Sequence, residues 1–112
     1  MKIQNVVIIG SGTMGSGIAA HLCNANIPVT LLDLKTEISE KARDRIFRSS
    51  PPLLLDKSKI NNIKIGNISD NFNVVKEADW IVEAVVERID VKHSIYKRIF
   101  EERKPGAIVS SN

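Results

Sequence analysis

Short apolar runs alternate along this chain with longer segments in which apolar residues recur at helical spacing. The runs are rich in Val, Ile and Leu and are bounded by Gly, Pro, Asn or Asp, which is typical of strands buried on both faces of a parallel sheet. They predict strands at residues 5–9, 29–32, 63–65, 80–86 and 107–109. The segments between them predict helices at residues 14–25, 36–48, 74–78 and, starting at 88 or 89, to 103.

The longer predicted helices each carry an apolar stripe. The stripes are Met14, Ile18 and Leu22 in the first helix, Ile38, Ala42 and Ile46 in the second, and Val91, Ile95 and Ile99 in the last. Residues four positions apart lie on the same side of an α-helix, so each stripe is expected to face the core. Thr36 is expected to cap the second helix.

A glycine motif joins the first predicted strand to the first helix. It reads Gly10-Ser11-Gly12-Thr13-Met14-Gly15, with G-x-G-x-x-G spacing. In this motif the first glycine allows a sharp turn, the second lets the backbone approach a pyrophosphate, and the third lets the helix pack tightly on the sheet. The helix N-terminus adds free N–H groups and the positive end of its dipole. Because the motif follows a strand and opens a helix, dinucleotide binding is favoured over a glycine-rich turn without a ligand.

The predicted element order sets the topology. Right-handed crossovers arrange five successive strands into a parallel sheet with the order 3-2-1-4-5. The chain direction reverses between the first and fourth strands, and ligands of such sheets lie across the carboxyl ends of the strands at that point. We therefore expect an α/β, Rossmann-type doubly wound parallel sheet that is truncated before the sixth strand.

Asp33 is the expected ribose-binding residue. It follows the glycine motif by about 20 residues and ends the second predicted strand, where a carboxylate accepts hydrogen bonds from the ribose hydroxyls of adenosine. Its negative charge would oppose a 2′-phosphate, which favours NAD over NADP as the cofactor. Lys35 lies nearby in the sequence and would favour NADP, but we give it less weight than Asp33.

Composition excludes several classes of partner. The 112 residues are 43% hydrophobic, which is enough for the core of one domain. The net charge is only +3 and basic residues are spread among acidic ones, so no nucleic-acid partner is expected. Neither a signal peptide nor a membrane helix is evident, so no membrane partner is expected. Cys23 is the single cysteine, which excludes an internal disulfide and fits a cytoplasmic location.

Few side chains are candidates for catalysis. His21 and His93 are the only histidines, and their positions within predicted helices do not favour either as a general base. Cys23 is interpreted as a small buried residue. Glu83 lies inside a strand and is interpreted as structural, whereas Glu87 falls at the carboxyl end of that strand, where ligands bind. No catalytic residue and no metal ligand are therefore predicted.

Several segments resemble one known family. Residues 6–20, V-V-I-I-G-S-G-T-M-G-S-G-I-A-A, are similar to the opening of the L-3-hydroxyacyl-CoA dehydrogenases of fatty-acid β-oxidation. Residues 79–87, D-W-I-V-E-A-V-V-E, resemble that family's D-x-[IV]-[IV]-E-A-V-x-E segment, and Lys92 stands where the family has a lysine. Residues 105–112 resemble the strand that leads into S-N-T-S. The resemblance covers almost all of the chain and is closest to long-form bacterial members that continue into a hydratase-like region.

The resemblance implies an NAD-binding domain and assigns its contacts. It implies that the glycine motif holds the pyrophosphate and Asp33 the adenosine ribose, that residues 85–87 and Lys92 line the nicotinamide half, and that Asn112 lies near the nicotinamide ribose. The expected NAD-binding residues are Gly10, Ser11, Gly12, Thr13, Met14, Gly15, Asp33, Val85, Val86, Glu87, Lys92 and Asn112.

The resemblance also implies what residues 1–112 lack. In the family, the catalytic histidine and glutamate follow a sixth strand, and a further helical domain holds the acyl-CoA substrate and forms the dimer. We therefore expect an incomplete NAD-binding domain that binds NAD without turnover. The uncovered edge of the strand at 107–109 is expected to favour self-association unless a second half covers it.

Two other functions stay open at this point. One is a non-catalytic remnant, or a split subunit that works only with a separately encoded partner chain. The other is a β-hydroxyacid dehydrogenase of the hydroxyisobutyrate type, which shares the G-x-G-x-M-G pattern. The spacing from Glu87 to Lys92 and the Ser110-Ser111-Asn112 segment argue against this last alternative.

Overall fold

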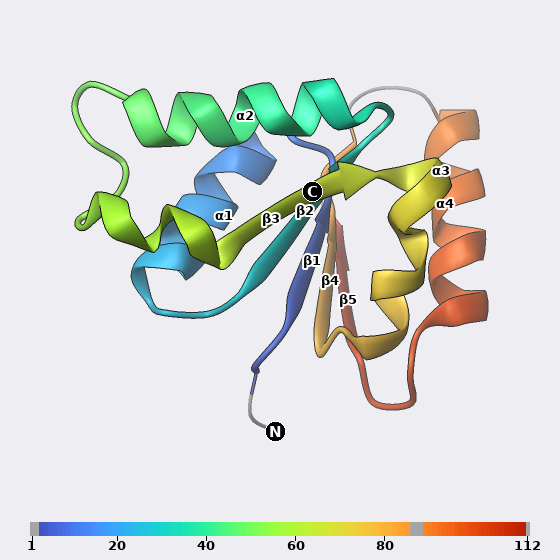
Figure 1. The fold of residues 1–112 in the computed structure, drawn as a ribbon. Coiled ribbons are helices and arrows are strands. Elements are labelled where there is room, and N and C mark those ends of the chain that lie inside the picture. The colour runs from blue at the N-terminus through green and yellow to red at the C-terminus, as the bar shows by residue number, and fades with distance from the viewer. Residues whose placement is uncertain (1–2, 86–88, 112) are drawn as a thin grey trace.

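A single parallel sheet with helices on both faces forms the protein (Figure 1). The computed structural model describes residues 3–85 and 89–111. The strands are β1 (Val6–Ile9), β2 (Val29–Asp33), β3 (Ile63–Asn67), β4 (Trp80–Glu83) and β5 (Ile108–Ser111). They lie in the order β3-β2-β1-β4-β5, and every pairing is parallel. The predicted α/β doubly wound topology is therefore confirmed.

The helices agree with the prediction at their centres and differ at some ends. The α-helices are α1 (Thr13–Asn24), α2 (Thr36–Arg48), α3 (Ile68–Asn71) and α4 (Ile89–Glu102), and the 3-10 helices are η1 (Lys57–Asn62) and η2 (Phe72–Glu77). The range 36–48 was predicted with its observed bounds. The helix predicted at 74–78 begins earlier, because α3 and η2 follow β3 without a break.

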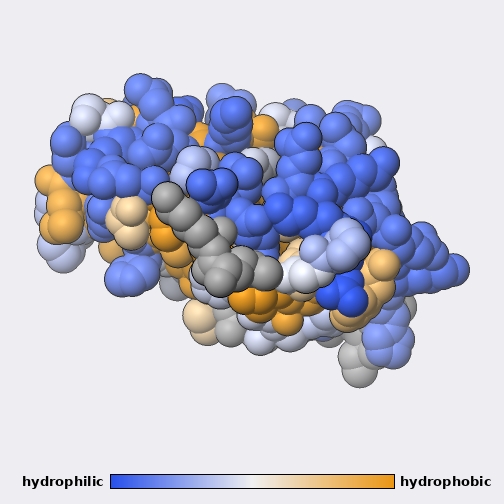
Figure 2. All heavy atoms as spheres, turned by 90° about the horizontal axis from the view of Figure 1, so that it is seen from below, coloured by the Kyte–Doolittle hydropathy of each residue, from blue (hydrophilic) through white to orange (hydrophobic). Residues whose placement is uncertain are grey.

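Two apolar cores lie on opposite faces of the sheet. Along β1, Val6 and Ile8 pack into the core under α1 and α2, whereas Val7 and Ile9 pack into the core under η2 and α4. Successive side chains of a strand point to opposite faces, and both faces are covered, so each strand is apolar throughout. Seen from the side where β1 begins, hydrophilic residues dominate the outer surface and hydrophobic ones appear only in patches (Figure 2).

Helix α1 buries only Leu22 of its predicted stripe. Met14 is 60% exposed and Ile18 is only partly buried. The buried residues of the helix are Gly15, Ser16, Ala19, Ala20, Leu22 and Cys23. A Cβ added to Gly15 would lie 2.0 Å from the Gly10 carbonyl oxygen, so the helix begins in direct contact with the preceding turn. This close approach favours small residues against the sheet at the start of the helix, and Met14 and Ile18 remain on its flank.

Helix α2 also departs from the prediction in two contacts. Its buried residues are Ser39, Ala42 and Ile46, whereas Ile38 is 39% exposed. The Ser39 hydroxyl donates to the carbonyl of Gly66 in β3 at 2.8 Å, so a polar residue is satisfied inside the core. Thr36 does not cap the helix, because the N-cap position is taken by Lys35 and Thr36 is already the first helical residue. Its hydroxyl accepts a hydrogen bond from the side chain of Asn67 instead.

Candidate dinucleotide-binding site

The carboxyl ends of the strands meet at one edge of the sheet. Ile9 at the end of β1 pairs with Leu32 in β2 and with Glu83 at the end of β4, and Glu83 pairs with Ser111 at the end of β5. This register places the chain segments that follow β1, β2 and β4 side by side, at the top of Figure 1. The edge is where a doubly wound sheet binds its ligand.

The turn after β1 requires glycine at its first position. Gly10 has φ +109°, a left-handed conformation that residues with a side chain rarely adopt. A Cβ at this position would lie 2.6 Å from the carbonyl carbon of Ala84. The N–H of Gly10 also donates to the carbonyl of Leu32 at 2.7 Å. The turn is therefore held against the ends of both neighbouring strands.

Gly12 differs from the other two glycines of the motif because it faces open space. A Cβ added to Gly12 would have no heavy atom within 4 Å. Gly12 is the N-cap of α1, no side chain caps the helix, and its first turn contains no acidic residue. The first N–H groups of an α-helix have no acceptor within the helix, and they attract anions. The residues present at this helix terminus therefore fit a pyrophosphate.

Asp33 lies beside the same turn. Its Oδ2 atom accepts hydrogen bonds from the Ser11 N–H at 2.8 Å and from the Ser11 hydroxyl at 2.6 Å. Its Oδ1 atom accepts from the N–H of Leu34 at 2.7 Å. The structure therefore brings the predicted pyrophosphate and ribose residues together, with the carboxylate in a defined orientation.

Arg45 is a basic residue near the turn that sequence reasoning missed. Its guanidinium reaches from α2 to the carbonyl of Ser11 at 3.2 Å. The same carbonyl accepts a hydrogen bond from the Ser16 hydroxyl at 2.9 Å. Arg45 lies 34 residues from Ser11 in sequence, and only the packing of α2 against α1 brings the two together, so no local pattern announces the contact.

A buried carboxylate organises the end of β4. Glu83 has 0% exposure, and its Oε2 atom accepts a hydrogen bond from the N–H of Val85 at 2.6 Å. Its Oε1 atom accepts from the Ser111 hydroxyl at 3.2 Å and lies 3.5 Å from Nζ of Lys92. Glu83 was interpreted only as a structural strand residue. The structure shows that it joins Val85 and Lys92, two predicted NAD-binding residues, to the end of β5.

The remaining predicted site residues are placed as follows. Thr13 and Met14 form the exposed first turn of α1. Val86, Glu87 and Asn112 lie outside the described residues, and their contacts stay predictions.

The residues set aside as catalytic candidates are either exposed or buried away from the turn. His21 and His93 are both exposed. Cys23 is fully buried and donates to the carbonyl of Lys59 at 2.9 Å, and burial raises the pKa of its thiol.

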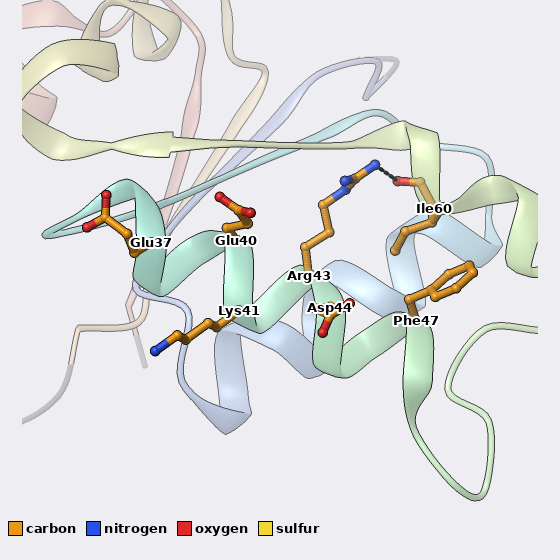
Figure 3. A pocket seen from close by; sticks show the side chains of 7 residues that line it. All are labelled: Glu37, Glu40, Lys41, Arg43, Asp44, Phe47 and Ile60. Atoms are coloured by element: carbon orange, nitrogen blue, oxygen red, sulfur yellow. Dashed lines mark hydrogen bonds between the residues drawn. The ribbon is translucent and has the colours of Figure 1, made fainter.

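A charged pocket of about 580 Å³ lies apart from the glycine turn, on the outer side of α2. It is lined by Glu37, Glu40, Lys41, Arg43, Asp44, Phe47 and Ile60. Figure 3 shows Arg43 reaching across to the carbonyl of Ile60, a contact of 3.4 Å. Because three of its seven lining residues are carboxylates, this pocket does not suit a pyrophosphate. Among the described residues no cluster suited to a metal ion occurs, and no helix is long and apolar enough to cross a membrane.

Fold and site together define a doubly wound α/β domain of the dinucleotide-binding class. The chain belongs to the family described as the 3-hydroxyacyl-CoA dehydrogenase NAD-binding domain, whose model matches residues 5–112. This match favours the predicted family over the hydroxyisobutyrate type.

Individual relatives agree with the family match. The chain is 35% identical over 119 residues to a probable 3-hydroxyacyl-CoA dehydrogenase of Deinococcus radiodurans, covering 100% of this chain and 34% of the relative. It is 36% identical over 118 residues to a putative fatty acid oxidation complex trifunctional enzyme of Rickettsia felis, covering 99% of this chain and 16% of the relative. The crystal structure of 3-hydroxybutyryl-CoA dehydrogenase from Escherichia coli is similar with a TM-score of 0.84 and 27% identity, covering 100% of this chain and 25% of that one. The chain thus spans about a third or less of the length of these relatives.

Proposed function

We propose that residues 1–112 are the NAD-binding part of a 3-hydroxyacyl-CoA dehydrogenase that oxidises L-3-hydroxyacyl-CoA to 3-ketoacyl-CoA in fatty-acid β-oxidation. The observation that carries the proposal is the open space at Gly12, at the start of α1, with Asp33 hydrogen-bonded to the same turn. The family match and the names of the relatives support the substrate class. When bound, NAD supplies the hydride acceptor.

The residues of this chain would bind and orient the cofactor. The turn from Gly10 to Gly15 would hold the pyrophosphate with its backbone N–H groups, and Asp33 would bind the adenosine ribose. Val85 and Lys92 would line the nicotinamide half, held in place by Glu83. We extend the same role to Val86, Glu87 and Asn112 on the sequence resemblance alone.

We also propose that this part does not transfer the hydride by itself. Oxidation of a hydroxyl needs a general base within hydrogen-bond reach of its proton. His21 lies on the flank of α1 beside Leu22 and Trp80, and His93 is exposed on α4. The base and the acyl-CoA site would then come from a second half of the enzyme, in the same chain or in a partner. The length of the relatives favours such a half.

Calorimetry of the 112-residue chain with NAD and with NADP tests the proposed function. We expect NAD to bind and NADP to bind at least about tenfold more weakly, because Asp33 would face the 2′-phosphate. Equal affinity for both nucleotides, or no binding of either, would contradict the proposal.

A separate measurement, the intact mass of the protein as the cell makes it, tests whether the second half belongs to the same chain. A mass close to 12.4 kDa would leave a partner chain or a non-catalytic remnant, whereas a larger mass would support catalytic groups in the same chain.

A further inference from the structure

Asp33 has few acceptor positions left for a ligand. A carboxylate offers about four lone-pair positions, two on each oxygen. Ser11 fills both positions on Oδ2, one through its N–H at 2.8 Å and one through its hydroxyl at 2.6 Å. The N–H of Leu34 fills one position on Oδ1 at 2.7 Å. One position, on Oδ1, remains.

The Ser11 hydroxyl is well fixed in this arrangement. Ser11 is 1% exposed, so its hydroxyl cannot turn to water. A hydroxyl that donates to a carboxylate at 2.6 Å forms one of the stronger classes of hydrogen bond. The Ser11 carbonyl is held by the Ser16 hydroxyl and by Arg45, which keeps the turn itself in place.

The ribose of adenosine presents two hydroxyl groups, at the 2′ and 3′ positions, and both can donate. A carboxylate with one free position on each oxygen accepts both. We propose that Ser11 determines which ribose hydroxyls the site recognises. Its hydroxyl occupies the second acceptor position on Oδ2 of Asp33, so that Asp33 recognises a single ribose hydroxyl. The inference rests on the proposed function, since it takes Asp33 as the ribose-binding residue, and it adds that the site tolerates an adenine nucleotide lacking the other hydroxyl.

Calorimetry with ADP, 2′-deoxy-ADP and 3′-deoxy-ADP tests this on the unaltered protein. We expect one deoxynucleotide to bind about tenfold more weakly than ADP, as for a lost hydrogen bond to a charged group. The other should bind within about twofold of ADP, because its missing hydroxyl has no acceptor on Asp33. About tenfold weaker binding of both would overturn the inference, and this measurement needs no variant.

The variant Ser11→Ala opens the second acceptor position. With it, both deoxynucleotides should bind more weakly than ADP by at least about threefold. Ser16→Ala is the matched control, because it removes a buried hydroxyl of α1 that bonds the carbonyl of Ser11 and does not touch Asp33. Like the unaltered protein, Ser16→Ala should bind only one of the two deoxynucleotides more weakly than ADP. A Ser11→Ala protein that still loses affinity for only one deoxynucleotide would overturn the role of Ser11.

Failure of the proposed function would give a different result in the ADP-binding measurements. If ADP does not bind, or binds equally well to Asp33→Ala, then the assignment of Asp33 to the ribose is wrong. If ADP binds through Asp33 but both hydroxyls contribute equally, then only the inference about Ser11 is wrong.

Discussion

Glu83 and Lys92 form an ion pair in which the carboxylate is completely buried. Oε1 of Glu83 lies 3.5 Å from Nζ of Lys92, and their side chains are 0% and 26% exposed. The same carboxylate accepts hydrogen bonds from Val85 and Ser111. A buried charge persists only when it is paired and hydrogen-bonded, so this pair couples the end of β4 to α4 and β5.

Glu83→Ala is therefore expected to destabilise the protein. It removes the acceptor of two hydrogen bonds and leaves Lys92 without this partner, so the free energy of unfolding should fall by about 2–4 kcal/mol in urea titrations. Glu102→Ala is the matched control, because Glu102 pairs with Arg98 at 3.6 Å one turn away on α4 and both side chains are partly exposed. Its effect should stay below about 0.5 kcal/mol. Equal losses in the two variants would contradict the structural role of Glu83.

Gly12→Ala should weaken NAD binding without unfolding the protein. Its methyl group would enter the space where the backbone must approach the pyrophosphate, so calorimetry should show affinity lower by at least about tenfold. Gly17→Ala is the matched control in the same helix, since its added Cβ also meets nothing within 4 Å. NAD affinity equal to that of the unaltered protein in both variants would show that the pyrophosphate does not lie over Gly12.

Gly15→Ala should instead act on stability. The added Cβ would lie 2.0 Å from the carbonyl oxygen of Gly10, a backbone atom that cannot move without shifting α1 from the sheet. We expect the free energy of unfolding to fall by about 1–3 kcal/mol, as for other overpacked sites. Gly17→Ala should raise it slightly, because alanine is the better helix former. Urea midpoints that rank the two variants in the opposite order would contradict the packing described.

Asp79 should make stability depend on pH in acid. The Lys104 ammonium at 2.6 Å, together with the N–H groups of Gln4 and Asn5, lowers the pKa of Asp79 from 3.8 to about 2. A carboxyl whose pKa is lower in the folded state contributes stability above the pKa of the unfolded chain. This contribution is lost as pH falls from about 3.8 through about 2.

Thermal melts of the unaltered protein and of Asp79→Asn between pH 5 and about pH 2 check this dependence. The melting temperatures of the two proteins should differ most at pH 5 and converge toward pH 2. Lys104→Met should weaken the dependence, because the Lys104 hydrogen bond is the largest cause of the lowered pKa. Melting temperatures that fall in parallel in all these proteins would assign the acid sensitivity to other groups.

The edge of β5 should promote self-association. Among the described strands β5 pairs only with β4, and Ile108 is 47% exposed. Unpaired strand edges with apolar side chains pair readily with other chains. Light scattering should show mass that rises with concentration, and Ile108→Lys should suppress the rise. Leu55→Lys is the control at an 89% exposed residue away from the sheet. A monodisperse monomer of the unaltered protein would contradict this prediction.

Local signals were sufficient for the sheet of this chain, although they missed η1 and α3. Apolar runs, glycine and proline breaks and the right-handed crossover rule predicted all five strands, their order and the bounds of α2. The G-x-G-x-x-G spacing predicted the turn at Gly10 because only a residue without a side chain can take φ +109° against Ala84. These features depend on neighbours in the chain or on chirality, so a single sequence is enough to predict them.

The sequence did not predict which face of a helix is buried or which polar side chains are paired in the core, because both depend on distances between separate elements. The stripe at Met14 and Ile18 was expected to be buried, but Gly15 brings α1 so near the sheet that small residues fill the interface. Ser39 is buried because Gly66 offers it an acceptor across β3. Neither outcome is visible in hydrophobicity alone.

By itself, the sequence determined the parallel sheet, the glycine turn at its carboxyl edge and the family to which the chain belongs. Only the tertiary structure decided that Ser11 occupies Oδ2 of Asp33 and that Glu83 pairs with Lys92. Periodicity and motifs record interactions along the chain, whereas a hydrogen bond between residues far apart in sequence exists only after packing has set the distance between their elements.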